Sequence, residues 1–218
     1  MADTRQQLCG EDCRRLVVKL GTNLLTAGTE RLNLDMMASL VGQVSRLHQQ
    51  GREVLLVTSG AVAAGRQELG LTRSTSSPNE VSPRCIGARM RTGQAHDRKD
   101  IPFKQVLAAV GQGRLMDAYH QLFALHSITI AQTLLTRRDL SDRLGYLNAR
   151  NTLLALLELR VVPIINENDV VAVEELEGTT FGDNDRLSAL VANLGDADLL
   201  VLLTDTPGLF TADPPRDP

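Results

Sequence analysis

Two short clusters of acid and amide side chains are the clearest sign of chemistry in this sequence. The letters "NEND" span residues 166–169, and "GDND" spans residues 182–185. The first cluster follows an apolar run and the second precedes one, so they are expected at a strand end and at a helix start. Carboxylates accept hydrogen bonds from an ammonium group, and amides can donate to a carboxylate. Clusters that converge on one cleft would therefore suit an amino acid, whereas the plainer alternatives are a turn and a helix cap by Asp183.

A metal ion is the other ligand that such oxygens can hold. The sequence places no histidine at a zinc-ligand spacing near the clusters, and it lacks the spacing of an EF-hand loop. A hard-ion site built from oxygens alone stays open. We therefore assign no residue as a metal ligand.

Lys19 is a third candidate, because it is one of only three lysines and lies in the apolar stretch "RRLVVKL". A charge in a buried strand is costly unless it has a partner. Followed by "GTN", this ammonium group suits a point charge held against phosphate oxygens. The alternative is a lysine at a strand end that reaches water along its own stem.

Two further stretches favour anion or nucleotide binding. In "VTSGAVAAGRQELG" (57–70) a strand ends in Ser-Gly and a helix follows at once, and free amides at a helix start attract phosphate or carboxylate. The stretch lacks the Lys and Ser/Thr of a P-loop, and the chain has no GxGxxG fingerprint. In "LLTDTPGLFTADP" (202–214), Thr204 and Asp205 follow a strand and are placed to touch a nucleotide, unless this is a simple connecting turn.

Strands and helices that alternate along the chain must position these residues. Short apolar runs predict strands at 14–20, 53–58, 128–135, 161–166 and 198–204, and helical periodicity predicts helices at 33–50, 60–69, 103–125, 146–159 and 184–194. This alternation indicates an α/β fold with a mainly parallel sheet covered on both faces. Ligands of such sheets bind at the carboxyl ends of the strands, which is where the candidate residues fall.

Residues 72–102 break the pattern, because they combine Ser, Pro, Gly and Arg without periodicity. We expect a flexible insertion loop there, although its basic residues could contact phosphates. The chain of 218 residues has a net charge of −3 and 3% aromatic residues, which argues against a nucleic-acid partner. Its apolar runs are too short to span a membrane and its first residues lack a signal-peptide core, so a cytoplasmic protein is expected.

Long motifs in a fixed order resemble the amino acid kinase family. They are "VVKLGTNLL", "VTSGAVAAGR", "VLAAVGQGRLM", "YLNARNTL", "VPIINENDVVA", "FGDNDRLSALVA" and "LLTDTPGLFTADP", and they extend from Leu16 to Pro214. The resemblance is to members that phosphorylate the γ-carboxylate of L-glutamate, the first step of proline biosynthesis. It implies a three-layer αβα sandwich, ATP and Mg²⁺ as cofactors, a homo-oligomer and feedback inhibition by proline. Members acting on carbamate, aspartate or UMP, and a non-catalytic amino-acid-binding form of the same fold, are the alternatives.

The resemblance also assigns roles to individual residues. It makes Lys19 the lysine that neutralises the transferring phosphoryl group and Asp185 the acid that organises catalytic lysines. The other assignments are glutamate binding for Ser59, Asp169 and Asn184, and nucleotide binding for Lys19, Gly21, Gly60, Thr204 and Asp205.

One departure from the family pattern concerns the end of the chain. The pattern continues beyond "TADP" with a glycine-rich nucleotide loop and a second lysine, whereas this chain ends at Pro218. We therefore expect one kinase-like domain over residues 1–218 whose C-terminal part is absent, with poor ATP binding and little turnover.

Overall fold

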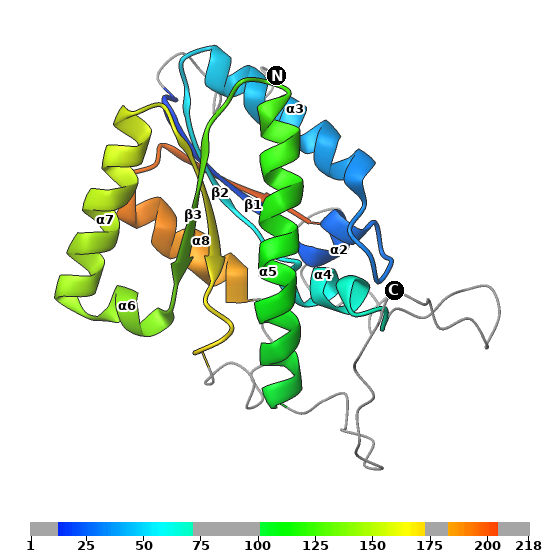
Figure 1. Cartoon of the computed structure of the whole chain (residues 1–218). Coiled ribbons are helices and arrows are strands. Elements are labelled where there is room, and N and C mark those ends of the chain that lie inside the picture. The colour runs from blue at the N-terminus through cyan, green and yellow to red at the C-terminus, as the bar shows by residue number, and fades with distance from the viewer. Residues whose placement is uncertain (1–12, 72–100, 173–182, 205–218) are drawn as a thin grey trace, which may run out of the picture.

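A five-stranded parallel sheet forms the centre of the protein in a computed structural model that describes residues 13–71, 101–172 and 183–204 (Figure 1). The strand order is β3-β4-β2-β1-β5, and every neighbouring pair is parallel. The strands are β1 (Arg15–Leu20), β2 (Glu53–Val57), β3 (Ile130–Leu135), β4 (Val162–Glu167) and β5 (Leu199–Leu203). Because all strands are parallel, their carboxyl ends meet at one edge of the sheet.

Helices cover both faces of this sheet, so the molecule has three layers (Figure 1). One face packs against α2 (Thr22–Thr26), α3 (Leu34–Gln49), α4 (Ala61–Glu68) and α5 (Ile101–Ala124). The other packs against α6 (Arg137–Ser141), α7 (Arg143–Glu158) and α8 (Asp183–Leu194). The predicted three-layer αβα sandwich is confirmed. Of the helices in the described ranges, none is both long enough and apolar enough to cross a membrane.

Alternation along the strands decides which side chains meet which helices. Val18 and Leu56 lie in the apolar cluster with α3 and α5, whereas Val17 and Leu55 lie in the cluster with α7 and α8. Successive side chains of a strand point to opposite faces, so both sets are buried. This double burial explains why the strands read as continuous apolar runs.

Two helices were not expected from the sequence, and several boundaries differ from the prediction, among them the start of α7 at Arg143 in place of residue 146. The short helices α2 and α6 were not expected, because five residues are too few to show helical periodicity. Helix α5 begins at Ile101, so the last two residues of the predicted 72–102 loop are helical. Pro102 is compatible with this position, because the amides of a first helical turn have no partner within the helix. Residues 72–100 lie outside the described part, and their flexibility stays a prediction.

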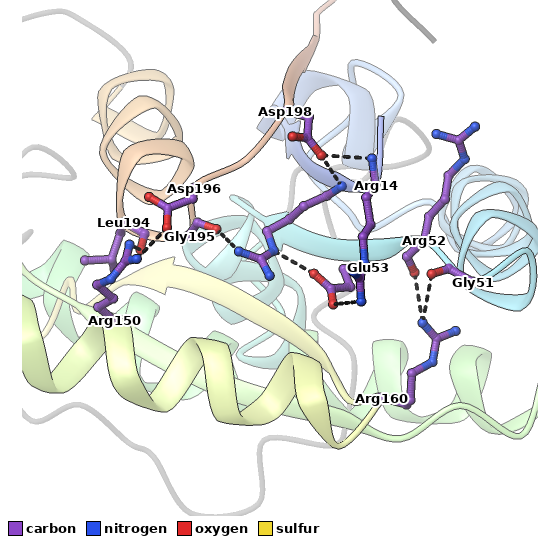
Figure 2. Close-up of polar contacts among 11 residues, drawn as sticks. Arg14, Gly51, Arg52, Glu53, Arg150, Arg160, Leu194, Gly195, Asp196 and Asp198 are labelled. Atoms are coloured by element: carbon purple, nitrogen blue, oxygen red, sulfur yellow. Dashed lines mark hydrogen bonds and ion pairs between the residues drawn. The ribbon is translucent and has the colours of Figure 1, made fainter. Parts of the chain in front are cut away.

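Arginine side chains hold helix ends at the edge of the sheet where the strands begin (Figure 2). Arg15 donates to the carbonyl of Gly195 and Arg150 to that of Leu194, at the C-terminal end of α8. Arg160 donates to carbonyls of residues 48, 51 and 52, just where α3 ends. Cations suit these positions, since the last carbonyls of a helix lack partners and carry the negative end of its dipole. The edge where the strands begin therefore holds the helix ends in place, and the candidate functional residues lie at the opposite edge, at the carboxyl ends of the strands.

Candidate active site at the carboxyl ends of the strands

Lys19 and Asp185 form an ion pair that joins β1 to α8. The Nζ atom of Lys19 lies 2.5 Å from Oδ1 of Asp185. Lys19 shares the face of the sheet with Val17, which packs against α8, so its side chain points toward that helix. The lysine side chain is only 12% exposed, whereas that of Asp185 is 54% exposed. A mostly buried ammonium group thus has a carboxylate partner at the solvent edge, as its burial requires.

An open hollow lies beside this pair, at the ends of β1 and β5. It has a volume of about 210 Å³ and is lined by Lys19, Gly21, Thr22, Asn23, Leu24, Leu203 and Thr204. Helix α2 starts here behind Gly21, and its first three residues line the hollow. A Cβ atom on Gly21 would lie 3.5 Å from Nζ of Lys19 and 3.7 Å from the carbonyl oxygen of Leu203, so a side chain there would occupy the space beside the ammonium group.

These features fit the phosphate groups of a nucleotide, because an ammonium group and the start of a helix border one concave space. Gly21, Thr204 and Lys19, three residues of the predicted nucleotide set, all line this hollow, and their role in nucleotide binding stays a prediction. Asp205, the remaining residue of the predicted nucleotide set at this strand end, lies outside the described residues.

Asn184, on the first turn of α8, makes the contacts that define a second part of the site. Its Nδ2 atom donates to Oγ of Ser59 at 2.6 Å and to the carbonyl oxygen of Thr58 at 2.9 Å. The same atom lies 3.4 Å from Oδ1 of Asn166 at the end of β4. The two acid and amide clusters that the sequence singled out are therefore in contact, although 18 residues separate these two asparagines.

Three predicted residues border this second part. Asp169 lies in the turn that follows β4, where the backbone N–H of Asn168 donates to the carbonyl of Leu135. Gly60 precedes α4 with a φ of 99°, a left-handed conformation that favours glycine. Asp183 is the first residue of α8, and the preceding position lies outside the described residues, so the helix-cap alternative stays a prediction.

Helix α5 contributes two side chains that sequence reasoning did not assign to the site. The Oε1 atom of Gln112 accepts a hydrogen bond from Nδ2 of Asn166 at 2.9 Å. The hydroxyl of Tyr119 lies 2.7 Å from Oγ1 of Thr58, and burial raises the pKa of this phenol far above its usual range. Gln112 lies between the buried Ala108 and Leu115 on the stripe of α5 that faces the core. A polar residue in that apolar stripe was the signal that could have revealed it.

Metal ligation depends on which acidic, histidine and cysteine side chains lie close together. Within the described ranges no group of three or more His, Cys, Asp or Glu side chains is placed to hold a metal ion. Mg²⁺ usually keeps several waters and binds through substrate phosphates with one or two carboxylates. Among the described carboxylates, Asp185 contacts Lys19, which lines the nucleotide hollow. The chain thus fits an ion that arrives with phosphates better than an all-protein metal cage.

The arrangement can bind two different reactants side by side. The hollow at β1 and β5 suits phosphates, and the polar group around Asn184 suits the charged ends of an amino acid. Asn184 and Asp185 are adjacent on α8, so one helix turn contacts both parts. The strand-end lysine thus lies between the hollow and the polar group around Asn184, at the edge of a parallel sheet where ligands of such sheets bind.

Comparison with known proteins gives the family. The sequence model described as "Amino acid kinase family" matches residues 14–218, and the chain belongs to this family. It is 54% identical over 209 residues to a protein named glutamate 5-kinase from Dehalococcoides mccartyi (strain ATCC BAA-2266 / KCTC 15142 / 195), covering 96% of this chain and 50% of that protein. A protein of the same name from Herpetosiphon aurantiacus is 52% identical over 204 residues, covering 94% of this chain and 48% of that protein. The chain thus spans about half the length of the curated relatives it matches.

Proposed function

We propose that this chain carries the substrate-phosphorylating site of a glutamate 5-kinase. The reaction transfers the γ-phosphoryl group of ATP to the γ-carboxylate of L-glutamate and gives glutamyl 5-phosphate, the first step of proline biosynthesis. The observation that carries the proposal is the ion pair between Lys19 and Asp185, which lies between a phosphate-sized hollow and the polar group around Asn184. Relatives about half identical to this chain bear the name of that enzyme.

The chemistry needs positioning and charge neutralisation more than proton transfer. A γ-carboxylate is already ionised at neutral pH, so no general base is required to make it a nucleophile. One carboxylate oxygen forms a bond to the γ-phosphorus, the bond from that phosphorus to the β,γ-bridging oxygen breaks, and ADP leaves with the electron pair. Negative charge is spread over the equatorial oxygens during this transfer. In this proposal Lys19 neutralises that charge, and Asp185 keeps the ammonium group of Lys19 in place.

The subsites have separate tasks in this proposal. Asn184, Ser59 and Asp169 bind glutamate, and Gly21, Thr204 and Asp205 line the nucleotide side. The resemblance also assigns Gly60 to the nucleotide, from its place next to Ser59. Helix-start amides supply further positive potential toward the phosphates. Mg²⁺, bound through the phosphates, would add Lewis-acid neutralisation of their charge. A homo-oligomer, feedback inhibition by proline and a cytoplasmic location remain predictions of the same resemblance.

Hydroxamate formation tests the proposal directly. Purified protein is incubated with L-glutamate, ATP, Mg²⁺ and hydroxylamine, which converts an acyl phosphate into a hydroxamate that is measured as its coloured iron(III) complex. Aspartate and carbamate serve as alternative acceptors, and ligand-induced thermal stabilisation by glutamate and by ATP is measured in parallel. Hydroxamate formation with glutamate, and with neither of the other acceptors, supports the proposal. Glutamate stabilisation without turnover indicates the amino-acid-binding alternative, and a response to another acceptor assigns a different branch of the family.

A further inference from the structure

Three side-chain amides form a chain that crosses the sheet edge from α5 to α8. Asn166 Nδ2 donates to Gln112 Oε1 at 2.9 Å, and Asn184 Nδ2 lies 3.4 Å from Asn166 Oδ1. Each of these residues comes from a different element, since Gln112 is on α5, Asn166 on β4 and Asn184 on α8. This chain of three amides therefore connects the helix layer on one face of the sheet with α8 on the other face.

The amide chain has a defined direction, because each amide has one donor end and one acceptor end. The oxygen of Gln112 requires the nitrogen of Asn166 to face it, which turns Oδ1 of Asn166 the other way. That oxygen also accepts from the backbone N–H of Glu167 at 2.9 Å. It then joins the carbonyl of Thr58 and the hydroxyl of Ser59 as an acceptor around Nδ2 of Asn184. Asn184 Nδ2 is thereby fixed on this side, and Asn184 Oδ1 must point to the other.

The two ends of the amide chain differ chemically. Oδ1 of Asn184 is a buried acceptor, and Nε2 of Gln112 is a buried donor, and neither has a hydrogen-bond partner within the part of the chain that the structure describes. A buried acceptor without a partner is unfavourable until a donor reaches it. The ammonium group of an amino acid is such a donor. The orientation of Asn184 is therefore the property on which recognition of the ammonium group depends.

We infer that Gln112 is a positioning residue for the amino-acid substrate, which acts by holding Asn166, and through it Asn184, with Asn184 Oδ1 toward the substrate ammonium group. This inference rests on the proposed amino-acid site. It assigns Gln112 no contact with substrate. Its predicted effect is therefore on the binding of glutamate and not on that of the nucleotide, whose hollow lies at β1 and β5.

The packing of α5 supports this role, because it fixes the depth of Gln112. A Cβ atom on Gly111 would lie 1.8 Å from the carbonyl oxygen of Ala61, and one on Gly65 would lie 1.9 Å from the carbonyl oxygen of Leu107. The backbones of α4 and α5 thus touch at the residue next to Gln112. Tyr119, two helical turns further along α5, holds Thr58 from the same side. One face of α5 therefore contacts two of the residues whose oxygens surround Nδ2 of Asn184, namely Thr58 after β2 and Asn166 on β4.

Two substitutions of Gln112 test the oxygen and the nitrogen of its amide separately. Gln112→Met keeps the length of the side chain but removes the oxygen that orients Asn166. Gln112→Glu keeps an acceptor oxygen and removes the Nε2 donor. Gln121→Met is the matched control, because Gln121 lies exposed on the same helix. The measurements are the KM or binding constant for glutamate, the KM for ATP, and the thermal midpoint of each protein without ligand.

We expect Gln112→Met to weaken glutamate binding about tenfold with the KM for ATP unchanged, as the loss of one well-placed hydrogen bond predicts. Gln112→Glu is expected to bind glutamate more tightly than Gln112→Met, and Gln121→Met to behave like the unsubstituted protein. In an Asn184→Ala background, Gln112→Met should have no further effect, because the two residues act in series.

Several outcomes would overturn the inference. Equal loss in Gln112→Glu and Gln112→Met would show that the Nε2 donor is the functional group. Additive effects with Asn184→Ala, or equal losses for glutamate and ATP, would show a general structural role. If Gln112→Met binds glutamate as well as the unsubstituted protein does, Gln112 is not a positioning residue, and the proposed function stays intact. An unsubstituted protein that binds no glutamate would remove the proposed function and this inference together.

Discussion

Lys19 Nζ lies 2.5 Å from Asp185 Oδ1, so a residue of the first strand is paired with one on the first turn of α8. The pair brings together residues that are 166 positions apart (185 − 19 = 166). It also marks the boundary between the nucleotide hollow and the polar group around Asn184. Because Asp185 is adjacent to Asn184, a single helix turn contributes to both proposed reactant sites.

Replacing either member of this pair is expected to affect turnover more than glutamate binding. Lys19→Met removes the positive charge beside the phosphates, and we expect kcat to fall by at least about 100-fold, as for other charge-stabilising groups. Asp185→Asn leaves the ammonium group without its counter-charge and should lower kcat less. Hydroxamate formation and glutamate-induced stabilisation are measured for both variants. Glu68→Gln is the control, because it breaks a more exposed ion pair with Arg114 at 3.8 Å and should change neither.

The contact between α4 and α5 predicts a sharp difference between neighbouring glycines. Gly111→Ala would place a Cβ atom 1.8 Å from the carbonyl oxygen of Ala61, so the helices must separate. We expect the free energy of unfolding to fall by about 3 kcal/mol or more. Gly113→Ala is the matched control on the same helix, because no described atom outside its own stretch of helix lies within 4 Å of its Cβ position. This control should raise stability by about 0.5–1 kcal/mol, since alanine favours helix more than glycine. Urea unfolding of both variants measures the difference, and equal effects would contradict the close contact.

The buried hydrogen bond between Tyr119 and Thr58 predicts a measurable coupling. Tyr119→Phe removes one partner of the 2.7 Å contact and should lower the free energy of unfolding by about 1–2 kcal/mol. Thr58→Val removes the other partner. If Tyr119 and Thr58 stabilise the fold through this hydrogen bond, the free energy of unfolding of the double variant should fall by about 1 kcal/mol less than the sum of the two single decreases. A strictly additive double variant would be the contrary result.

Tyr119 also predicts a loss of stability in alkaline solution. Burial raises the pKa of its phenol far above the ordinary value of 10.0, so the folded protein keeps the proton that the unfolded chain releases. The stabilisation is complete below pH 10 and decreases as the pH rises above it. Tyr119→Phe should reduce this alkaline loss. Unfolding curves recorded across that range, for both proteins, provide the measurement.

Asp198 predicts a contribution to stability that acid removes. Its Oδ2 accepts hydrogen bonds from the backbone N–H groups of Arg14 at 2.8 Å and Arg15 at 2.7 Å, which join the starts of β1 and β5 (Figure 2). These bonds, from Arg15 first and then Arg14, lower the pKa of the carboxyl group below its ordinary value of 3.8. The stabilisation is present above pH 3.8 and is lost as the pH falls through the lowered pKa.

Asp198→Asn is the variant that tests this contribution. The amide oxygen can still accept from both N–H groups, but it has no charge to lose. We therefore expect a flatter dependence of stability on pH below 3.8 than in the unsubstituted protein. A dependence that is unchanged by the substitution would mean that other carboxylates control unfolding in acid.

The fold could be predicted largely from sequence because the signals are local. Apolar runs such as "EVLLV" and periodic stretches such as residues 33–50 report burial on two faces and on one face, respectively. The short helices α2 and α6 escaped prediction because five residues give no period. α6 had a different signal, a reciprocal capping box between Thr136 and Asp139, which decides a helix start without any apolar pattern.

The sequence by itself determined which residue types stand at the strand ends, among them Lys19, Ser59, Asn184 and Thr204. Only the tertiary structure decided their partners. The contact of Asn184 with Ser59, that of Asp185 with Lys19, and that of Gln112 with Asn166 each join two elements that are distant in sequence. The physical reason is that strand order and helix packing are settled by burial of apolar surface over the whole sheet. A motif can name a polar residue, but the packed layers decide which other polar group it must face.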